Sequence, residues 1–279
     1  MIDRKRFGLN RIVAPSLGLA DFYDLASSLE IAKVELRNDL GQVDPVDGLD
    51  PGEAARLAAD RGIEVISINA LQKFNLAAVR PVATAELQAL LELANAIGCE
   101  AVVMCPNNDA ADARSGEQRM AETIDSLAAF APLFTDAGVT GYIEPLGFSI
   151  SSLSSLLAAQ EAIERSGCAC YRVVHDTFHL HIGPDDPDIL GTTYRLAMTG
   201  LVHISGVEDH IARDDFRDGH RILVGPADTM SSKAQIERVD RLGYRGDFSY
   251  EAFSPAIQSL GPVELASALQ KSLAYLIAE

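Results

Sequence analysis

Residues 172–179 read Arg-Val-Val-His-Asp-Thr-Phe-His, a short apolar run that ends in ionisable side chains. Runs of this kind recur from one end of the chain to the other, with loops and longer stretches of helical periodicity between them. This alternation is typical of an α/β fold with a parallel sheet. The predicted strands are Gly8 to Ala14, Ala32 to Asn38, Glu64 to Asn69, Ala101 to Pro106, Gly141 to Leu146, Arg172 to Asp176, Leu201 to Gly206 and Asp247 to Phe253.

Helix signals fill the intervals between these strands. Asp50, Pro51 and Glu53 have the spacing of an N-cap and of the first and third residues of a helix. The segments from Ala85 to Ile97 and from Glu117 to Ala137 are predicted amphipathic helices that pack one face on a sheet. A glycine stands near the end of several helical runs, where a left-handed residue ends a helix: Gly62, Gly98, Gly138 and Gly243.

About eight strands is the number that closes a parallel barrel of usual size, roughly 250 residues. No linker rich in Pro, Gly or Ser divides the chain. We therefore predict a single (β/α)8 TIM-barrel domain over residues 1–279. A doubly wound open sheet is the main alternative. Its phosphate loop, G-x-G-x-x-G, does not fit Pro15-Ser-Leu-Gly-Leu19, which follows the first strand.

The charge balance of the chain excludes several classes of partner. Its 279 residues carry 23 Lys and Arg against 40 Asp and Glu, a net charge of −17. A surface this acidic repels phosphate backbones and anionic lipids, so we expect neither nucleic acid nor a membrane as partner. The densest basic stretch, Arg4 to Arg6, precedes no apolar signal segment, and we expect a cytoplasmic protein. The sequence leaves the oligomeric state open, homo-oligomers included.

Ionised groups within a strand are costly unless something pairs them, so charged residues at strand ends are informative. Glu144, Asp176, His203 and Glu251 each lie at or near the carboxyl end of a predicted strand, the face on which barrel enzymes assemble their sites. Three carboxylates and an imidazole from strands five to eight would repel one another if empty. A divalent cation removes the repulsion, and we predict a metal site formed by these four side chains.

The donor types narrow the choice of metal. Oxygen-rich ligation with one nitrogen favours Mn²⁺ or Mg²⁺, with Co²⁺ and Zn²⁺ as alternatives, and Mn²⁺ is the first choice. The cysteines lack the C-x-x-C spacing of a zinc site and are predicted to be buried reduced thiols: Cys99, Cys105, Cys168 and Cys170. Taken singly, a strand-end Glu is often a solvated rim charge and a lone His a core residue. Four such residues at the same end of four successive strands favour a metal site.

Two histidines flank the Asp176 position differently. His179 is expected in the loop just beyond the strand, where its imidazole reaches a substrate oxygen or orients a metal ligand. His175 should point away from Asp176, toward the helix layer, because side chains alternate along a strand. His181 competes with His179 for the functional role.

Four further charged residues are candidates for substrate contact. Glu35 and Arg37 share one face of the second strand and form an internal ion pair or bind substrate hydroxyls, two readings of equal weight. Lys73 follows the third strand and Arg221 the seventh. For either of these two alone, solvated surface charge is the favoured account, and contact with an electron-rich substrate is the alternative.

Several motifs together resemble those of the xylose-isomerase-like TIM-barrel superfamily, which includes sugar isomerases, ketose 3-epimerases, hydroxypyruvate isomerase and endonuclease IV. The resemblance runs from about Arg11 to the C-terminus and is closest to the inosose isomerases of myo-inositol catabolism. The motifs that carry it are Val34-Glu-Leu-Arg, Ile143-Glu-Pro-Leu-Gly, His175-Asp-Thr-Phe-His, Val202-His-Ile-Ser-Gly-Val-Glu-Asp and Tyr250-Glu-Ala-Phe.

The resemblance implies a function and site roles. Glu144, Asp176, His203 and Glu251 match the family's metal ligands, Glu144 and Glu251 also its two proton-transfer carboxylates, and His179 its substrate-contacting histidine. The implied activity is an intramolecular oxidoreductase of EC 5.3.99 type. It converts 2-keto-myo-inositol to 1-keto-D-chiro-inositol through an enediolate.

Departures from the related families bear on the alternatives. Ketose 3-epimerases carry a further Glu after the strand-five ligand and an Arg after the strand-seven His, where this chain has Ser149 and Asp209. Endonuclease IV has many more histidines than the six here. The second hypothesis is therefore a ketose 3-epimerase or a hydroxypyruvate-type isomerase acting on an open-chain substrate. A non-catalytic sugar-binding barrel ranks third, because such a barrel would usually have lost a ligand.

Overall fold

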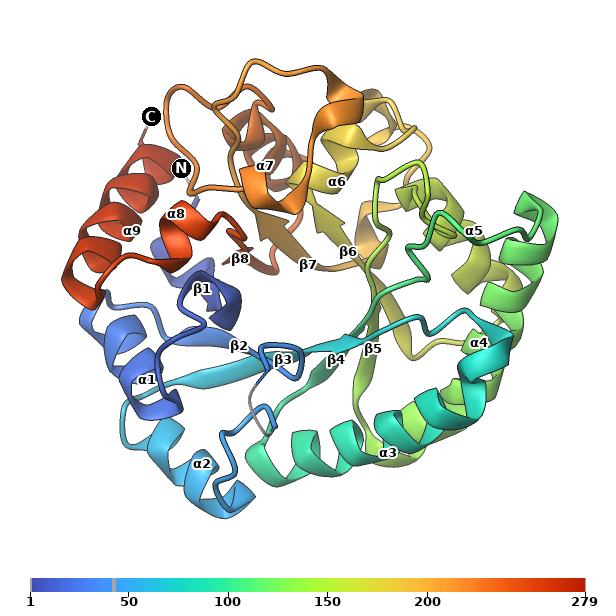
Figure 1. Cartoon of the computed structure of the whole chain (residues 1–279), viewed down its shortest axis with the longest axis horizontal. Coiled ribbons are helices and arrows are strands. Elements are labelled where there is room, and N and C mark those ends of the chain that lie inside the picture. The colour runs from blue at the N-terminus through green and yellow to red at the C-terminus, as the bar shows by residue number, and fades with distance from the viewer. Residues whose placement is uncertain (1, 42–43, 279) are drawn as a thin grey trace.

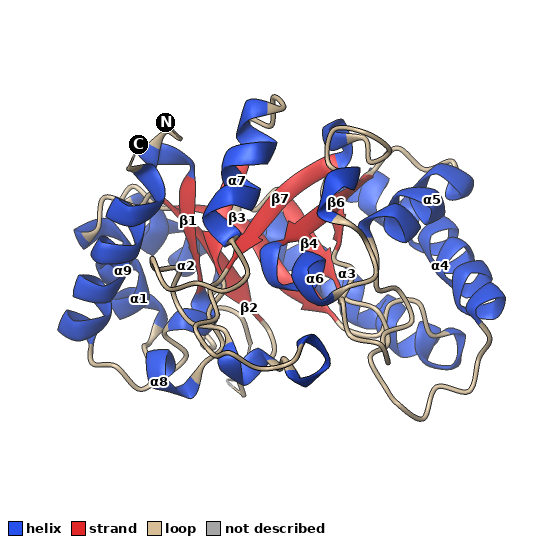
Figure 2. Ribbon diagram, turned by 90° about the horizontal axis from the view of Figure 1, so that it is seen from above, coloured by secondary structure: helices blue, strands red, loops and turns tan. Residues whose placement is uncertain are grey.

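The apolar runs of the sequence form the strands of a closed parallel barrel, in the order β1 to β8 around the ring. The computed structural model describes residues 2–41 and 44–278. Helices surround the barrel on the outside (Figure 1), and the strands lie at the centre between them (Figure 2). The strands are β1 Phe7–Asn10, β2 Lys33–Arg37, β3 Glu64–Leu71, β4 Ala101–Met104, β5 Thr140–Ile143, β6 Tyr171–Asp176, β7 Thr199–Ile204 and β8 Asp247–Tyr250.

The α-helices that cover the strands are α1 Leu19–Ser28, α2 Pro51–Ala59, α3 Arg80–Ile97, α4 Gly116–Ala137, α5 Leu156–Ser166, α6 Thr177–Ile182, α7 Ser232–Arg241, α8 Pro255–Gln258 and α9 Pro262–Ile277. Short 3-10 helices lie at Arg4–Arg6, Arg11–Val13, Ala77–Val79, Pro187–Ile189, Leu196–Met198, Arg213–Asp215 and Asp218–His220. The predicted α/β barrel is confirmed.

Strand positions were predicted better than strand ends. The first predicted strand extended to Ala14, but β1 stops at Asn10, whose side chain accepts a hydrogen bond from Ile12 N and starts a 3-10 turn. The fifth and eighth were also predicted too long at their carboxyl ends. Apolar residues continue into the loops there, so hydrophobicity alone marks no boundary.

Helix caps follow the predicted signals. Asp50 caps α2, its side chain accepting from Gly52 N and Glu53 N, with Pro51 as the first helical residue. Gly98 and Gly138 end α3 and α4 in the left-handed region. The third helix starts at Arg80 and not at Ala85, because Pro81 takes a favoured position in its first turn.

The described apolar core forms three clusters. The largest lies between the sheet and the helices, and a second fills the barrel interior with Ile66, Val103, Val174 and Leu201 among its members. A third, smaller cluster contains Phe178, Val207, Phe216 and Met230. Cys99 and Cys105 are buried and free, as predicted, whereas Cys168 and Cys170 are free but half-buried. Among the helices of the described ranges, none combines the length and the apolar character needed to cross a bilayer.

Candidate metal centre

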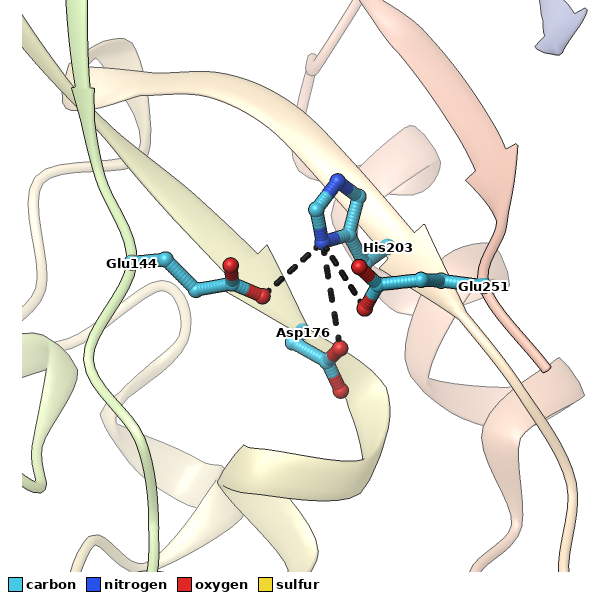
Figure 3. Close-up of side chains that lie close together, drawn as sticks. All are labelled: Glu144, Asp176, His203 and Glu251. Atoms are coloured by element: carbon cyan, nitrogen blue, oxygen red, sulfur yellow. Dashed lines mark hydrogen bonds and ion pairs between the residues drawn. The ribbon is translucent and has the colours of Figure 1, made fainter. Parts of the chain in front are cut away.

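The four predicted ligands come together at the carboxyl ends of neighbouring strands. Glu144 directly follows β5, Asp176 is the last residue of β6, His203 lies near the end of β7 and Glu251 directly follows β8. All four are buried, and one donor atom from each lies within 4.8 Å of the others. Figure 3 shows the three carboxylates pointing toward one nitrogen of His203.

That nitrogen is Nδ1 of His203. It lies 2.9 Å from Oε1 of Glu144, 3.3 Å from Oε2 of Glu251 and 3.9 Å from Oδ2 of Asp176. The other ring nitrogen, Nε2, lies 3.1 Å from Oε2 of Glu35. A carboxylate at Nε2 favours the tautomer that carries its hydrogen there, and this leaves the Nδ1 lone pair for a metal.

The two carboxylate oxygens of Asp176 have different partners. Oδ1 accepts from the backbone nitrogens of Phe178 and His179, which caps the first turn of α6. This leaves Oδ2 facing the cluster. The Asp-x-x-His motif therefore fixes the metal-facing oxygen and the start of the helix that carries His179.

The burial of these charges shifts their proton affinities. Burial lowers the pKa of His203, but the negative charges of Glu251, Glu35 and Glu144 outweigh it and raise that pKa well above its usual range. Burial raises the pKa of Glu251, yet the positive charges of His203 and Arg221 hold it well below its usual range. Burial also raises the pKa of Asp176, against the opposing charge of Arg221. The cluster is thus strongly anionic and held together by cations.

Two buried arginines donate hydrogen bonds to the carboxylates of the cluster. Nη2 of Arg221 donates to Oδ2 of Asp176 at 2.5 Å and to Oε2 of Glu251 at 2.8 Å. Nη1 of Arg37 donates to Oε1 of Glu251 at 2.8 Å. Both guanidiniums lie against the ring of Phe253, 5.2 Å and 4.8 Å from its centroid for Arg37 and Arg221.

The residues present fit a divalent cation. Of the buried ionisable side chains here, Glu35, Glu144, Asp176 and Glu251 are acidic and only two are guanidiniums. A metal bound at Nδ1 would displace the extra proton of His203, and these four carboxylates and two guanidiniums would then leave two negative charges, which is the charge of one divalent ion. Burial and the charge of Glu144 raise the pKa of Cys105 well above its usual range, and its sulfur is not among the four grouped donor atoms. Three carboxylate oxygens and one imidazole nitrogen form the donor set.

Arg221 and Lys73, the two loop cations, lie in different surroundings. The surface-charge account of Arg221 is wrong, since its side chain is 1% exposed. The loop after β7 folds back to the barrel through a bridge between Gly206 and Ile222, which a linear sequence does not reveal. Lys73 lies on the exposed turn after β3, and its contact with substrate stays a prediction.

Glu35 and Arg37 both point into the barrel, as the strand alternation predicted, but they pair with different partners. Glu35 accepts from Ser67, Asn10 and His203, whereas Arg37 binds Glu251 and Asp39. The direct ion pair between the two, one of the two readings of the sequence, does not form, and their contact with substrate hydroxyls stays a prediction.

His179 and His175 have different partners. His179 lies in α6 and not in a loop, because the Asp176 cap begins a helix directly after β6. Its Nδ1 accepts from Gly147 N, and burial lowers its pKa to about 4, so the imidazole is neutral with Nε2 as its donor. His175 contacts Gln235 of α7, on the helix-facing side as predicted.

Two contributors were missed from the sequence. Asn10 donates to both Glu35 and Glu251, at 3.3 Å each, and Cys105 Sγ lies 3.5 Å from Oε2 of Glu144. Asn10 stands at the carboxyl end of its strand, so the rule that identified the ligands applies to it. Its amide is uncharged, so it does not stand out at a strand end as a buried charge does.

A cavity of about 690 Å³ lies next to residues that contact the site, although none of the four predicted ligands lines it. Its lining includes Gly147, the donor to His179, and Asp218, which accepts from Nη1 of Arg221. Apolar rings and chains form part of its wall, Phe148, Ile182 and Phe216 among them. A Cβ on Gly147 would lie 2.2 Å from the backbone oxygen of His179, so only glycine permits this approach of loop and helix.

Comparison with known proteins identifies the family to which the chain belongs. The sequence profile of the xylose isomerase-like TIM barrel matches residues 23–278. The chain belongs to the xylose isomerase-like TIM-barrel family. A family member of known crystal structure, a xylose isomerase domain-containing protein from Salmonella typhimurium LT2, is 33% identical. The similarity covers 100% of this chain and 99% of that one, with a TM-score of 0.92.

Other solved structures share the xylose isomerase-like fold at lower identity. The IOLI protein, crystallised with a zinc atom, is 18% identical over 98% of both chains, with a TM-score of 0.88. A D-psicose 3-epimerase, solved in the presence of D-fructose, is 15% identical over 97% of both chains, with a TM-score of 0.74. At these identities the likeness concerns the fold. The comparison with curated proteins gave no match.

Proposed function

We propose that the chain is a divalent-metal-dependent isomerase that moves the carbonyl of a cyclic polyol ketone to the neighbouring carbon, with 2-keto-myo-inositol as substrate and 1-keto-D-chiro-inositol as product. The observation that carries this proposal is the position of Glu144 and Glu251 on two sides of one cluster, 2.9 Å and 3.3 Å from Nδ1 of His203 (Figure 3). Each carboxylate can reach one of two neighbouring carbons. The family and the resemblance to inosose isomerases support the reaction class.

The metal would be held by Glu144, Asp176, His203 and Glu251, with Mn²⁺ as first choice and Zn²⁺, found in the IOLI structure, as an alternative. When bound, a divalent ion supplies Lewis-acid stabilisation of the charge that develops on the two substrate oxygens. The side chains of this protein would carry out the proton transfers and bind the substrate.

The two carboxylates have different surroundings, which assigns them different roles. Glu251 receives hydrogen bonds from Arg37, Arg221 and Asn10, so its negative charge is already shared among three donors. Among the described residues, Glu144 contacts His203 and the Cys105 thiol and no arginine. Glu144 therefore takes the proton from the hydroxyl-bearing carbon.

The proton balance closes over one turnover. The carbon proton passes to Glu144 and exchanges with solvent, the hydroxyl proton moves to the former carbonyl oxygen, and one proton from solvent reaches the former carbonyl carbon through Glu251, so that both carboxylates end as they began. The guanidinium of Arg221 stabilises the negative charge on the substrate oxygens that lie beside Asp176. His179, neutral with Nε2 as donor, binds a substrate hydroxyl. The cavity beside the cluster holds the part of the ring that does not react.

Glutamine variants of the two carboxylates test these roles. Glu144→Gln is expected to abolish both isomerisation and exchange of the carbon proton with solvent, because the group that removes the proton is gone. Glu251→Gln is expected to abolish isomerisation while proton exchange from substrate continues. Metal content measured on each variant separates a lost proton-transfer group from a lost ligand. Near wild-type turnover in either variant would contradict its role.

The same metal-loaded preparation distinguishes the second candidate. A ketose 3-epimerase or hydroxypyruvate-type isomerase would turn over open-chain substrates and leave the inosose unchanged. A non-catalytic sugar-binding barrel would turn over neither. Turnover of the cyclic ketone with a higher kcat/KM than that of D-fructose or hydroxypyruvate supports the proposal.

A further inference from the structure

Asp218 stands next to Arg221 on the loop that follows β7. It is the first residue of the 3-10 turn Asp218–His220, and the backbone nitrogen of Arg221 donates to the backbone oxygen of Asp218. Side chains three residues apart on a 3-10 turn lie on the same side of it. Oδ1 of Asp218 accordingly accepts from Nη1 of Arg221 at 3.3 Å. The turn thus brings a carboxylate to the guanidinium that binds the cluster.

The pair of Asp218 and Arg221 connects the cluster to accessible space. Nη2 of the same guanidinium donates to Oδ2 of Asp176 and Oε2 of Glu251, so a single guanidinium separates Asp218 from two predicted ligands. The Arg221 side chain is 1% exposed, whereas that of Asp218 is 46% exposed. Asp218 also lines the cavity of about 690 Å³. A molecule in that cavity can therefore reach it without any rearrangement of the interior.

One carboxylate oxygen of Asp218 is available to such a molecule. Oδ1 accepts from Arg221, while Oδ2 has no hydrogen bond to any residue that the structure describes. An ionised carboxylate accepts hydrogen bonds and donates none, so the group that pairs with Oδ2 has to be a donor. Hydroxyl groups of a polyol are donors of this kind.

The position of Asp218 distinguishes it from the other charged residues of the cavity wall. Arg213, Asp214 and Arg217 also line the cavity, but within the described ranges none of their side chains bonds to a residue that binds the cluster. Asp218 lies near His179 as well. Burial lowers the pKa of His179, and the charge of Asp218 is among those that oppose this lowering. The carboxylate is therefore close to both side chains to which the proposed reaction assigns substrate oxygens.

The charges of the cavity wall indicate which ligands suit it. Its charged lining residues are two arginines and two aspartates, so the wall has no net charge that would attract an anion. At Asp218 itself, the carboxylate or phosphate of a ligand would meet a like charge, whereas a neutral hydroxyl would meet an acceptor.

We propose that Asp218 is a substrate-binding residue that determines specificity: Oδ2 accepts a hydrogen bond from a hydroxyl on a ring carbon remote from the reaction, while Arg221 holds Oδ1. The reacting carbons contact the cluster, and the remainder of the ring extends past Asp218 into the cavity. The inference rests on the proposed function and deepens it, because it selects neutral ring polyols over anionic substrates such as hydroxypyruvate.

Asp218→Ala and Asp218→Asn test this assignment, with Asp215→Asn as the matched control. Alanine removes the acceptor. Asparagine keeps an oxygen for Arg221 but replaces the negative charge with a neutral amide that can donate. Asp215 is an exposed aspartate of the same loop and is not among the residues that line the cavity, so its variant changes the net charge of the protein by the same amount.

Two ring polyols serve as ligands for the Mn²⁺-loaded protein: myo-inositol, which is neutral and has no carbonyl to isomerise, and quinate, which has one carboxylate. Asp218→Ala should raise the dissociation constant of myo-inositol by about tenfold or more, as expected from the loss of a hydrogen bond to a charged group. Asp218→Asn should raise it by less. The same variant should lower the dissociation constant of quinate, because the like charge is gone. Asp215→Asn should change neither value.

A role confined to holding Arg221 predicts a different pattern. Asp218→Ala would then displace the guanidinium, and the affinity for Mn²⁺ would change together with the affinity for myo-inositol. Because Arg221 keeps its bonds to Asp176 and Glu251, we expect an unchanged Mn²⁺ affinity, measured by competition with a chelator. The KM for 2-keto-myo-inositol should rise as the myo-inositol dissociation constant does, with a smaller change in kcat.

Four results would overturn the assignment: unchanged myo-inositol affinity in both position-218 variants, an equal loss of Mn²⁺ affinity in Asp218→Ala, no gain in quinate affinity in Asp218→Asn, or no binding of myo-inositol by the wild-type protein. Failure of the proposed function looks different. In that case the wild-type protein leaves the inosose unchanged, while the comparison of the two ligands still reports on Asp218.

Discussion

Oε2 of Glu35 lies 3.1 Å from Nε2 of His203, on the side of the imidazole opposite the three cluster carboxylates. The same oxygen accepts a hydrogen bond from Ser67 at 2.6 Å. This pair links strand β2 to strand β7 through the centre of the barrel. It fixes the imidazole so that Nδ1 faces the cluster.

Glu35→Gln should therefore weaken metal binding although it touches no ligand oxygen. Loss of a carboxylate that orients a metal-bound histidine typically costs about 10–100-fold in affinity. Competition between the protein and a chelator for Mn²⁺ measures the change. Glu161→Gln, on the exposed face of α5, is the control and should leave the affinity unchanged. Equal affinities for Glu35→Gln and wild type would show that Glu35 does not orient the histidine.

Arg221→Met should make the stability of the protein depend on metal. The guanidinium is the cation that neutralises Oδ2 of Asp176 and Oε2 of Glu251 in the metal-free cluster, and breaking such a buried pair costs about 3–5 kcal/mol. A divalent ion bound nearby replaces part of the lost charge. The free energy of unfolding, measured in urea with EDTA and with Mn²⁺, should fall most in EDTA.

The control for this experiment is Arg238→Met. Arg238 pairs with the exposed Asp188, and such surface pairs contribute about 0–1 kcal/mol. Arg238→Met should lower the free energy of unfolding only slightly, with and without metal. An equal loss for Arg221→Met under both conditions would mean that the arginine stabilises the loop and not the charge of the cluster.

Asp112 should contribute stability that disappears in acid. Hydrogen bonds from the Arg114 side chain hold the pKa of this carboxyl well below its usual value of 3.8, with burial opposing. A depressed folded-state pKa gives stability that is fully present above the unfolded value and is lost as pH falls through the folded one. Asp112→Asn should thus lower the melting temperature clearly at pH 7 and much less at pH 2. Asp109→Asn, in the same loop, is the control, and an Asp112→Asn difference that is the same at both pH values would refute the linkage.

The fold was predictable because its signals are local. Each apolar run, the Asp50–Pro51 start of α2 and the glycines after α3 and α4 act within a few residues. Strand ends were less predictable, because apolar residues such as the buried Pro145 and the half-buried Leu146 continue past β5 into a loop.

The site was predictable where the barrel itself positions the residue. The end of a parallel strand determines where Glu144, Asp176 and His203 lie, so spacing along the chain was sufficient to group them. Arg221 arrives on a loop whose return to the barrel depends on tertiary contacts, among them the hydrogen bond from Ser254 N to its backbone oxygen.

The proposed reaction requires the cluster to move a proton between neighbouring carbon atoms of a cyclic ketone. The direct test is the EDTA-treated protein, reloaded with Mn²⁺ and incubated with 2-keto-myo-inositol in D₂O, followed by NMR. We expect 1-keto-D-chiro-inositol to appear with deuterium at the former carbonyl carbon, and neither signal to appear in EDTA alone. Unchanged 2-keto-myo-inositol with no deuterium uptake by the Mn²⁺-loaded protein would contradict the account.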